Sequence, residues 1–178
     1  LLTPWANDAV IDPSGEVIYI RDDDTNELWT PTALPIRIEN SRYIIRHGQG
    51  YSCFEHASHG IYSKLIQFVS PDDPVKISSL TLKNNSGRTR RLTITAYVEW
   101  VLGASRRVTA PHIITEQDEE TGALLAYNGW DIEFGNRIAF ADLVGLQTGY
   151  TCNRAEFIGR NGSLDSPSSL FSSKPLKK

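Results

Sequence analysis

The side chains of this sequence best suited to acid–base chemistry are three consecutive aspartates, Asp22, Asp23 and Asp24. Two carboxylates at a matched separation can hydrolyse a glycosidic bond, one as the acid and the other as the nucleophile or base. Consecutive residues of a loop point in diverging directions, so this run does not meet that requirement. We interpret it as a solvated turn in which one aspartate caps backbone amides, and we assign no catalytic residue.

A second candidate is the H-x-x-H pair of His56 and His59, with Glu55 beside it and His47 upstream. Zinc takes four ligands, which usually come from rigid neighbouring elements. Residues three apart on a strand point to opposite sides of the pleat, which would separate the two rings. Surface or internally hydrogen-bonded histidines are the better interpretation, and we predict neither a metal site nor a cofactor.

The other short motifs carry little chemistry. The sequence has no G-x-S-x-G elbow, Walker loop or C-x-x-C pair. Gly48-Gln49-Gly50 lacks the third glycine and the following helix of a phosphate loop, so we interpret it as a tight turn that needs a positive φ. Trp29 lies in a polar, proline-flanked loop that allows it to be exposed, whereas Trp100 ends an alternating run on its apolar side and is expected in the core.

Composition narrows the class of protein. The 178 residues are 40% hydrophobic and carry a net charge of −3, as in a soluble globular domain. No basic stripe supports a nucleic-acid partner, and no apolar run is long enough to span a membrane. Cys53 and Cys152 are compatible with one disulfide in an exported protein or with two free thiols in a cytosolic one, and we favour free thiols.

The elements that must position these residues are short strands. Turn signals recur about every ten to fifteen residues, which is typical of an antiparallel sandwich or barrel. The clearest strand runs from Leu92 to Trp100, with apolar residues at every second position. Its predicted partner is Val75–Lys83, where the apolar phase slips between Ile77 and Leu80, so we expect a bulge near Ser78 and Ser79.

The same pattern predicts further strands and no long helix. For residues 136–146 a short helix is the alternative, and we favour a strand. The fold class is therefore all-β, with a domain over residues 1–163 and a Ser-, Pro- and Lys-rich linker or tail over 164–178. The further predicted strands are Glu16–Arg21, Arg42–Arg46, Tyr51–His56, Ile61–Val69, His112–Gln117, Gly122–Ala126 and Ile138–Leu143.

An ordered set of segments resembles one family. The segments are Leu2–Asp8, Tyr19–Thr25, Leu28–Thr32, His47–Tyr51, Phe68–Ile77, Leu80–Asn84 and Arg91–Gly103. In order and spacing they resemble the β-sandwich domain of glycoside hydrolase family 94, formerly glycosyltransferase family 36. Within that family of phosphorylases, the resemblance is strongest to the C-terminal region of the cyclic β-1,2-glucan synthases.

The resemblance implies a galactose-mutarotase-like supersandwich of two antiparallel sheets, incomplete at its N-terminal edge. In the family this domain precedes an (α/α)6 barrel, which holds the catalytic acid and the phosphate site. The expected function is therefore a non-catalytic domain that supports the barrel, glucan binding and dimerisation, and the chain alone is expected to be inactive. The alternatives are an autonomous carbohydrate-binding module and a stand-alone enzyme.

The resemblance also implies partners, a location and contact residues. The partners would be a β-glucan oligosaccharide, the barrel of the same parent chain and a second copy in a homodimer. The parent would associate with the bacterial inner membrane and hold this soluble domain on the cytoplasmic side. The residues expected to contact carbohydrate lie in the family-like loops and are Arg21, Asp22, Trp29, His47, Gln49 and Tyr51.

Overall fold

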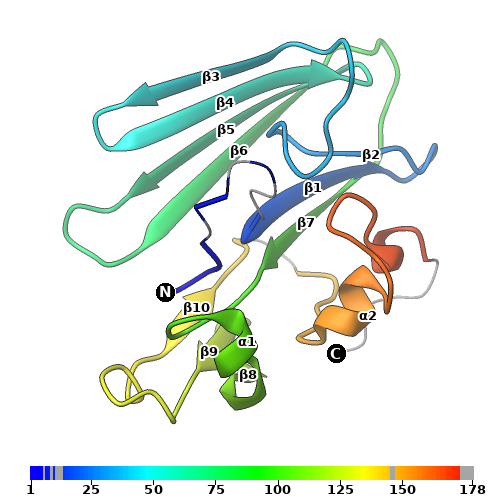
Figure 1. The fold of residues 1–178 in the computed structure, drawn as a ribbon. Helices are drawn as coiled ribbons and strands as arrows, with labels where there is room; N and C mark the ends of the chain where they lie inside the picture. Colours follow the sequence, from blue (N-terminus) through cyan, green and yellow to red (C-terminus); the bar gives the residue numbers. More distant parts are fainter. Residues whose placement is uncertain (6, 9, 11–13, 145–146, 173–178) are drawn as a thin grey trace. The chain divides into compact units, whose positions relative to one another are not determined.

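The computed structural model describes residues 1–5, 7–8, 10, 14–144 and 147–172. The chain divides into two compact units, and Figure 1 traces the elements of each. One unit is Ile18–Thr95, and the other combines Leu1–Val17 with Ala96–Lys178. The Asp12-Pro13-Ser14-Gly15 segment is one of the turn signals in the sequence, and its positions 12 and 13 lie outside the described residues.

The largest sheet belongs to the unit Ile18–Thr95 and contains four antiparallel strands in the order β3-β4-β5-β6 (Figure 1). They are β3 (Tyr43–Gly48), β4 (Tyr51–Ser58), β5 (Ile61–Val69) and β6 (Lys76–Asn84). Two of the connecting turns have the backbone that tight hairpins need. Gly50 has φ 79°, and His59 and Gly60 have φ 51° and 76°, the two positive values of a type I′ turn.

The predicted bulge near Ser78 and Ser79 is wrong. β5 and β6 pair without a slip from Ile61 opposite Asn84 to Val69 opposite Lys76. Ile77 lies opposite Phe68, whereas Leu80 lies opposite Leu65 on the other face. The apolar phase changes because β6 carries apolar side chains on both faces, and no extra residue is inserted.

A second sheet packs on the inner face of the first. It has the order β2-β1-β7, from β2 (Leu28–Trp29), β1 (Glu16–Asp22) and β7 (Leu92–Val98). The core between the sheets contains Ile20, Trp29 and Ile61, each at most 2% exposed. Side chains from strands of both sheets surround it, namely Leu82, Leu92 and Ile94, together with Ile38. Two sheets that share one apolar core form a sandwich.

The other unit contains a three-stranded antiparallel sheet and short helices. Its sheet has the order β10-β9-β8, from β10 (Ala139–Ala141), β9 (Leu124–Tyr127) and β8 (Ile114–Gln117). The helices are α1 (Arg106–Thr109), the 3-10 turn η1 (Ala110–His112), α2 (Arg154–Ile158) and the 3-10 turn η2 (Ser168–Leu170). The predicted strand His112–Gln117 starts late because η1 includes Pro111 and His112.

Aromatic stacking and one helix cap organise this unit. The Tyr97 ring stacks on Phe157 of α2 with 5.2 Å between centroids. Asn153 caps α2, because its side chain accepts hydrogen bonds from the backbone N–H groups of Ala155 and Glu156. Within the predicted tail, residues 164–172 include η2 and the buried Leu170, and 173–178 lie outside the described residues. The boundary at residue 163 stays a prediction.

The expected fold class is confirmed, because the described residues form mostly antiparallel strands with a few short helices. For residues 136–146 the favoured strand is present over Ala139–Ala141, while 145 and 146 lie outside the described residues. Among the described residues, no helix is long and apolar enough to cross a membrane.

Candidate functional site

The six predicted carbohydrate contacts do not share one environment, and Asp22 shows this most clearly. Its side chain is fully buried, and Oδ1 accepts hydrogen bonds from the backbone N–H groups of Asp24 (2.8 Å) and Thr25 (3.2 Å). Arg90, itself nearly buried, donates from Nε to Oδ2. The cap was predicted correctly, but the solvated setting was wrong, because β1 carries Asp22 into the unit and Arg90 neutralises its charge.

The electrostatics of Asp22 follow from these contacts. Burial opposes ionisation, but the donated backbone and guanidinium hydrogen bonds outweigh it and hold the pKa of Asp22 below its ordinary value. The neighbouring aspartates are also engaged. Asp23 accepts from Arg21 and Thr93, and Asp24 pairs with Arg91. The run is therefore a structural network that joins β1 to β7.

Trp29 is buried too, contrary to the expectation that its loop allows exposure. β2 pairs with β1 so that Trp29 lies opposite Ile20, and this register directs the indole into the core. One ring face is occupied by the His59 imidazole, whose centroid lies 4.7 Å away. Neither Asp22 nor Trp29 presents a surface to a ligand in this structure.

His47, Gln49 and Tyr51 lie together at the exposed end of the β3–β4 hairpin, which we call the hairpin tip (residues 47–51). The Tyr51 ring covers Gly48, since a Cβ at position 48 would lie 2.2 Å from Tyr51 Cε1. His47 is the opposite neighbour of Ser52, with Nδ1 2.9 Å from the Ser52 hydroxyl. The pair His47–Ser52 lies next to the pair Gly48–Tyr51 in the ladder. Because neighbouring pairs project their side chains to opposite faces of the sheet, His47 and Tyr51 point to opposite faces.

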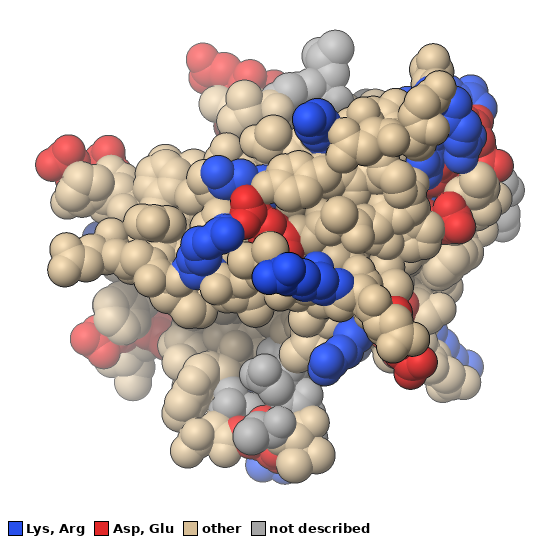
Figure 2. All heavy atoms as spheres, turned by 90° about the horizontal axis from the view of Figure 1, so that it is seen from above, with Lys and Arg blue, Asp and Glu red and all other residues tan. Residues whose placement is uncertain are grey.

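Tyr51 extends onto the outer face of the four-stranded sheet, the face turned away from the core. There Tyr51, Phe68 and Ile77 form one cross-strand row. Beside them Glu55 accepts from the Tyr62 hydroxyl at 2.5 Å and from Arg46. These donors hold the pKa of Glu55 below its ordinary value. Figure 2, seen from above, shows basic side chains gathered around an acidic group on a largely uncharged surface.

The histidine pair is not arranged for a metal ion. His56 Nε2 lies 2.8 Å from the Ser41 hydroxyl, and its ring stacks on Tyr43 at 3.9 Å. Burial lowers the pKa of His56, which favours the neutral imidazole. His59 instead stacks on Trp29. Among the described residues, no three His, Cys, Asp or Glu side chains are grouped so that they could hold an ion.

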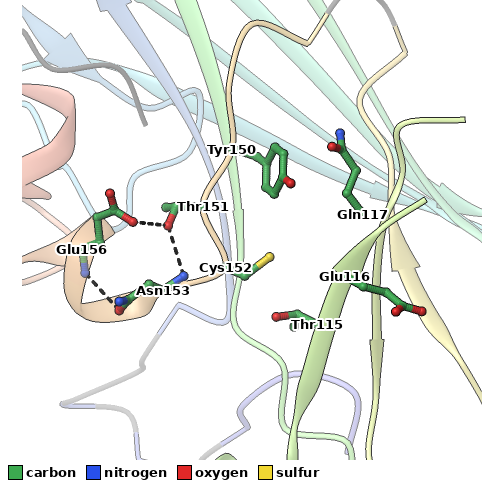
Figure 3. Close-up of a pocket in the computed structure, with 8 residues that line it drawn as sticks. All are labelled: Thr115, Glu116, Gln117, Tyr150, Thr151, Cys152, Asn153 and Glu156. Carbon is green, nitrogen blue, oxygen red and sulfur yellow. Dashed lines mark hydrogen bonds between the residues drawn. The ribbon is translucent and has the colours of Figure 1, made fainter. Parts of the chain in front are cut away.

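The other unit contains a pocket of about 350 Å³ that the sequence did not reveal (Figure 3). We call it the β8 pocket, because three lining residues come from β8 and the rest from the segment before and within α2. Its lining residues are Thr115, Glu116, Gln117, Tyr150, Thr151, Cys152, Asn153 and Glu156. They are common polar residues from segments more than thirty positions apart, with no recognisable spacing.

The two carboxylates of the β8 pocket do not form a hydrolytic pair. Figure 3 shows Glu116 and Glu156 at opposite ends of the pocket, pointing away from each other. Glu156 accepts from the Thr151 hydroxyl at 2.5 Å. Cys152 is an exposed free thiol and Cys53 a buried one, and their reduced state stays a prediction.

Together these features define a mostly β domain with polar and aromatic surfaces, in which Asp22, Asp23, Asp24, Glu55 and Glu156 are engaged in structural contacts. A family model described as the glycosyl hydrolase 94 supersandwich domain matches residues 1–178. The chain belongs to this family, as the resemblance predicted, and such domains are parts of carbohydrate-active enzymes.

Three individual relatives show which enzymes the chain is similar to. It is 38% identical to a cyclic beta-(1,2)-glucan synthase, NdvB, from Rhizobium meliloti (strain 1021), over 98% of this chain and 6% of the relative. It is 32% identical to the solabiose phosphorylase of Paenibacillus borealis, over 91% of this chain and 23% of the relative. An N,N'-diacetylchitobiose phosphorylase from Vibrio proteolyticus is 30% identical over 56% of this chain and 13% of the relative. The chain therefore spans less than a quarter of each of these relatives.

Proposed function

We propose that the chain is a non-catalytic domain of a larger glucan-processing enzyme. The observation that carries the proposal is that the chain matches a family domain over its whole length yet spans only 6% and 23% of two relatives named for synthesis and phosphorolysis. The parent would then hold its reacting groups in another domain, an (α/α)6 barrel. A membrane-associated parent and a homodimer belong to the same proposal.

The role of this domain would be to support the barrel and to offer the hairpin tip to a glucan chain. Tyr51 is 48% exposed, and His47 and Gln49 are exposed beside it. The Tyr51 ring can stack on a sugar ring and the Gln49 amide at the turn can bond its hydroxyls, while His47 lies on the opposite face of the sheet. Arg21, Asp22 and Trp29 would act indirectly, by holding the sheets that carry the hairpin.

The test is a comparison of the chain with a full-length parent enzyme. Each is incubated with β-1,2-linked gluco-oligosaccharide and inorganic phosphate, and release of glucose 1-phosphate is measured. We expect release by the parent and none by the chain. Release by the chain at a rate comparable to the parent would overturn the proposal, because the reacting groups would then lie within these residues.

A second candidate is an autonomous carbohydrate-binding module. It is favoured by the Tyr51–Phe68–Ile77 row beside the Arg46–Glu55–Tyr62 network on the outer face. Calorimetric titration of the chain with the same oligosaccharide distinguishes the two. Binding by the chain that is lost in Tyr51→Ala supports the module. Binding by the chain that persists in Tyr51→Ala, or binding seen only with the full parent, supports the accessory domain.

A further inference from the structure

We propose that the β8 pocket binds a neutral sugar unit and rejects phosphorylated sugars. The inference rests on the proposed function for its ligand class, but it concerns a different surface from the hairpin tip. The pocket volume of about 350 Å³ lies at the lower end of the range for small-molecule sites, which suits a ligand of one or two sugar rings.

The lining chemistry matches a polyhydroxylated ligand. Tyr150 supplies an aromatic face and a hydroxyl, and Figure 3 shows it between the two walls of the pocket, across from the side chains of β8. Gln117 donates one amide hydrogen bond to the Gly122 carbonyl at 3.2 Å, which fixes its orientation and leaves its amide oxygen as an acceptor. Thr115 adds a hydroxyl that can donate or accept. Sugar hydroxyls need both kinds of partner.

One wall of the pocket is preorganised. The Thr151 hydroxyl donates to Glu156 and accepts from the backbone N–H of Asn153 at 3.2 Å. The Asn153 side-chain oxygen in turn accepts from the backbone N–H groups of Ala155 and Glu156 at 3.0 and 3.2 Å. Because these groups already hold one another in place, ligand binding would lose little conformational entropy in ordering them.

Charge selects among sugar ligands. The eight lining residues include Glu116 and Glu156 and no lysine or arginine. A phosphate group would enter a site whose charged lining side chains are carboxylates, Glu116 at one end and Glu156 at the other, without a cationic partner, and like charges repel. Hydroxyl groups instead donate to carboxylates in charge-assisted hydrogen bonds. The pocket therefore favours an uncharged sugar over its phosphate ester.

Cys152 makes the test direct, because its exposed thiol lines the pocket whereas Cys53 is buried. A thiol-specific reagent is applied to the full chain, and mass spectrometry follows labelling at each cysteine. The probes are the β-1,2-linked glucose disaccharide and glucose 1-phosphate. At a disaccharide concentration of twice Kd, labelling of Cys152 should slow about threefold, since only one pocket in three stays empty. Glucose 1-phosphate should leave the rate unchanged.

Matched variants separate the pocket from the hairpin tip. Tyr150→Ala and Gln117→Ala should remove the protection, and Tyr150→Phe tests the hydroxyl in a variant that keeps the ring. Tyr51→Ala should leave the protection intact, and unlabelled Cys53 reports that each variant is folded. Absence of protection, equal protection by glucose 1-phosphate, or loss of protection in Tyr51→Ala would each overturn the inference. Those outcomes leave the glucose 1-phosphate release test of the proposed function unaffected.

Discussion

The contribution of an ionisable side chain to the stability of this protein depends on its burial and its immediate partners. Asp22 and Asp24 are two positions apart in the sequence, yet Asp22 is fully buried against Arg90 and Asp24 is 35% exposed against an Arg91 that is 74% exposed. Water screens the second pair and not the first. The two aspartates therefore offer a matched comparison of a buried and an exposed ion pair.

Asp22→Ala should lower the free energy of unfolding by about 3 kcal/mol, because it leaves the Arg90 guanidinium buried without its counter-charge. Asp24→Ala should cost less than about 1 kcal/mol, as is usual for exposed ion pairs. Denaturant unfolding followed by circular dichroism measures both. Equal losses would show that burial does not distinguish the two pairs.

His56 should make stability depend on pH. Burial lowers the pKa of His56 in the folded state below the ordinary histidine value of 6.5, so the unfolded chain binds the proton more readily. The contribution of the neutral ring is present above pH 6.5 and is lost as the pH falls from there toward the folded pKa. The free energy of unfolding, measured from pH 7.5 down to about pH 5, should therefore decline once the pH falls below about 6.5.

The control for this prediction is a pair of substitutions. His56→Gln should flatten the decline, since no titrating group remains at that position. His47→Gln should retain it, because His47 is exposed at the hairpin tip. A decline that persists unchanged in His56→Gln would assign the effect to another group.

At the scale of elements, two hairpin turns of the four-stranded sheet differ in the space around their glycines. The β4–β5 turn brings Gly60 close to Ser86, so that a Cβ at position 60 would lie 2.8 Å from the Ser86 Cβ. The β3–β4 turn has nothing within 4 Å of the equivalent position on Gly50. The two glycines have nearly the same φ, 76° and 79°, so they differ mainly in their surroundings.

Gly50→Ala should cost about 1 kcal/mol, which is the backbone penalty of a positive φ. Gly60→Ala should cost about 1–3 kcal/mol more, because its Cβ also overlaps Ser86 and the neighbouring strands must shift. Thermal unfolding of the two variants under the same conditions gives the comparison. Similar losses would mean that the β4–β5 turn relaxes without disturbing its sheet.

At the scale of the whole molecule, the chain corresponds to one domain of much longer relatives. The chain covers 6% of the glucan synthase relative and 23% of the solabiose phosphorylase relative. Under the proposed function, a contribution of the hairpin tip to glucan turnover would be visible only in a full-length parent enzyme. The buried core, in contrast, can be measured in the chain itself.

In a full-length parent, Tyr51→Ala should raise KM for glucan about tenfold with little change in kcat. The reason is that a stacking contact remote from the reacting bond binds ground state and transition state alike, and about 1.4 kcal/mol corresponds to that factor. Steady-state kinetics measure it. Phe68→Leu, which keeps an apolar neighbour in the same row, is the control and should leave KM near the wild-type value. A fall in kcat alone would contradict a binding role.

The sequence by itself determined where most of the strands lie and to which family the chain belongs, but it placed Trp29 of β2 in a loop. A run rich in β-branched and aromatic residues between turn signals predicted Ile61–Val69 with the bounds that the structure has, and Gly50 was correctly placed in a tight turn with positive φ. These features are local, because strand propensity and backbone sterics act between near neighbours. The order and spacing of the family-like segments predicted the family.

Only the tertiary structure decided which side chains are accessible. Trp29 is buried because β2 pairs with β1 and the four-stranded sheet covers this side of it, and Asp22 is buried because Arg90, distant in sequence, meets it. The β8 pocket likewise forms where β8 meets residues 150–156. Burial and pocket formation depend on contacts between segments far apart in the chain, and the spacing of residues within one segment contains no information about them.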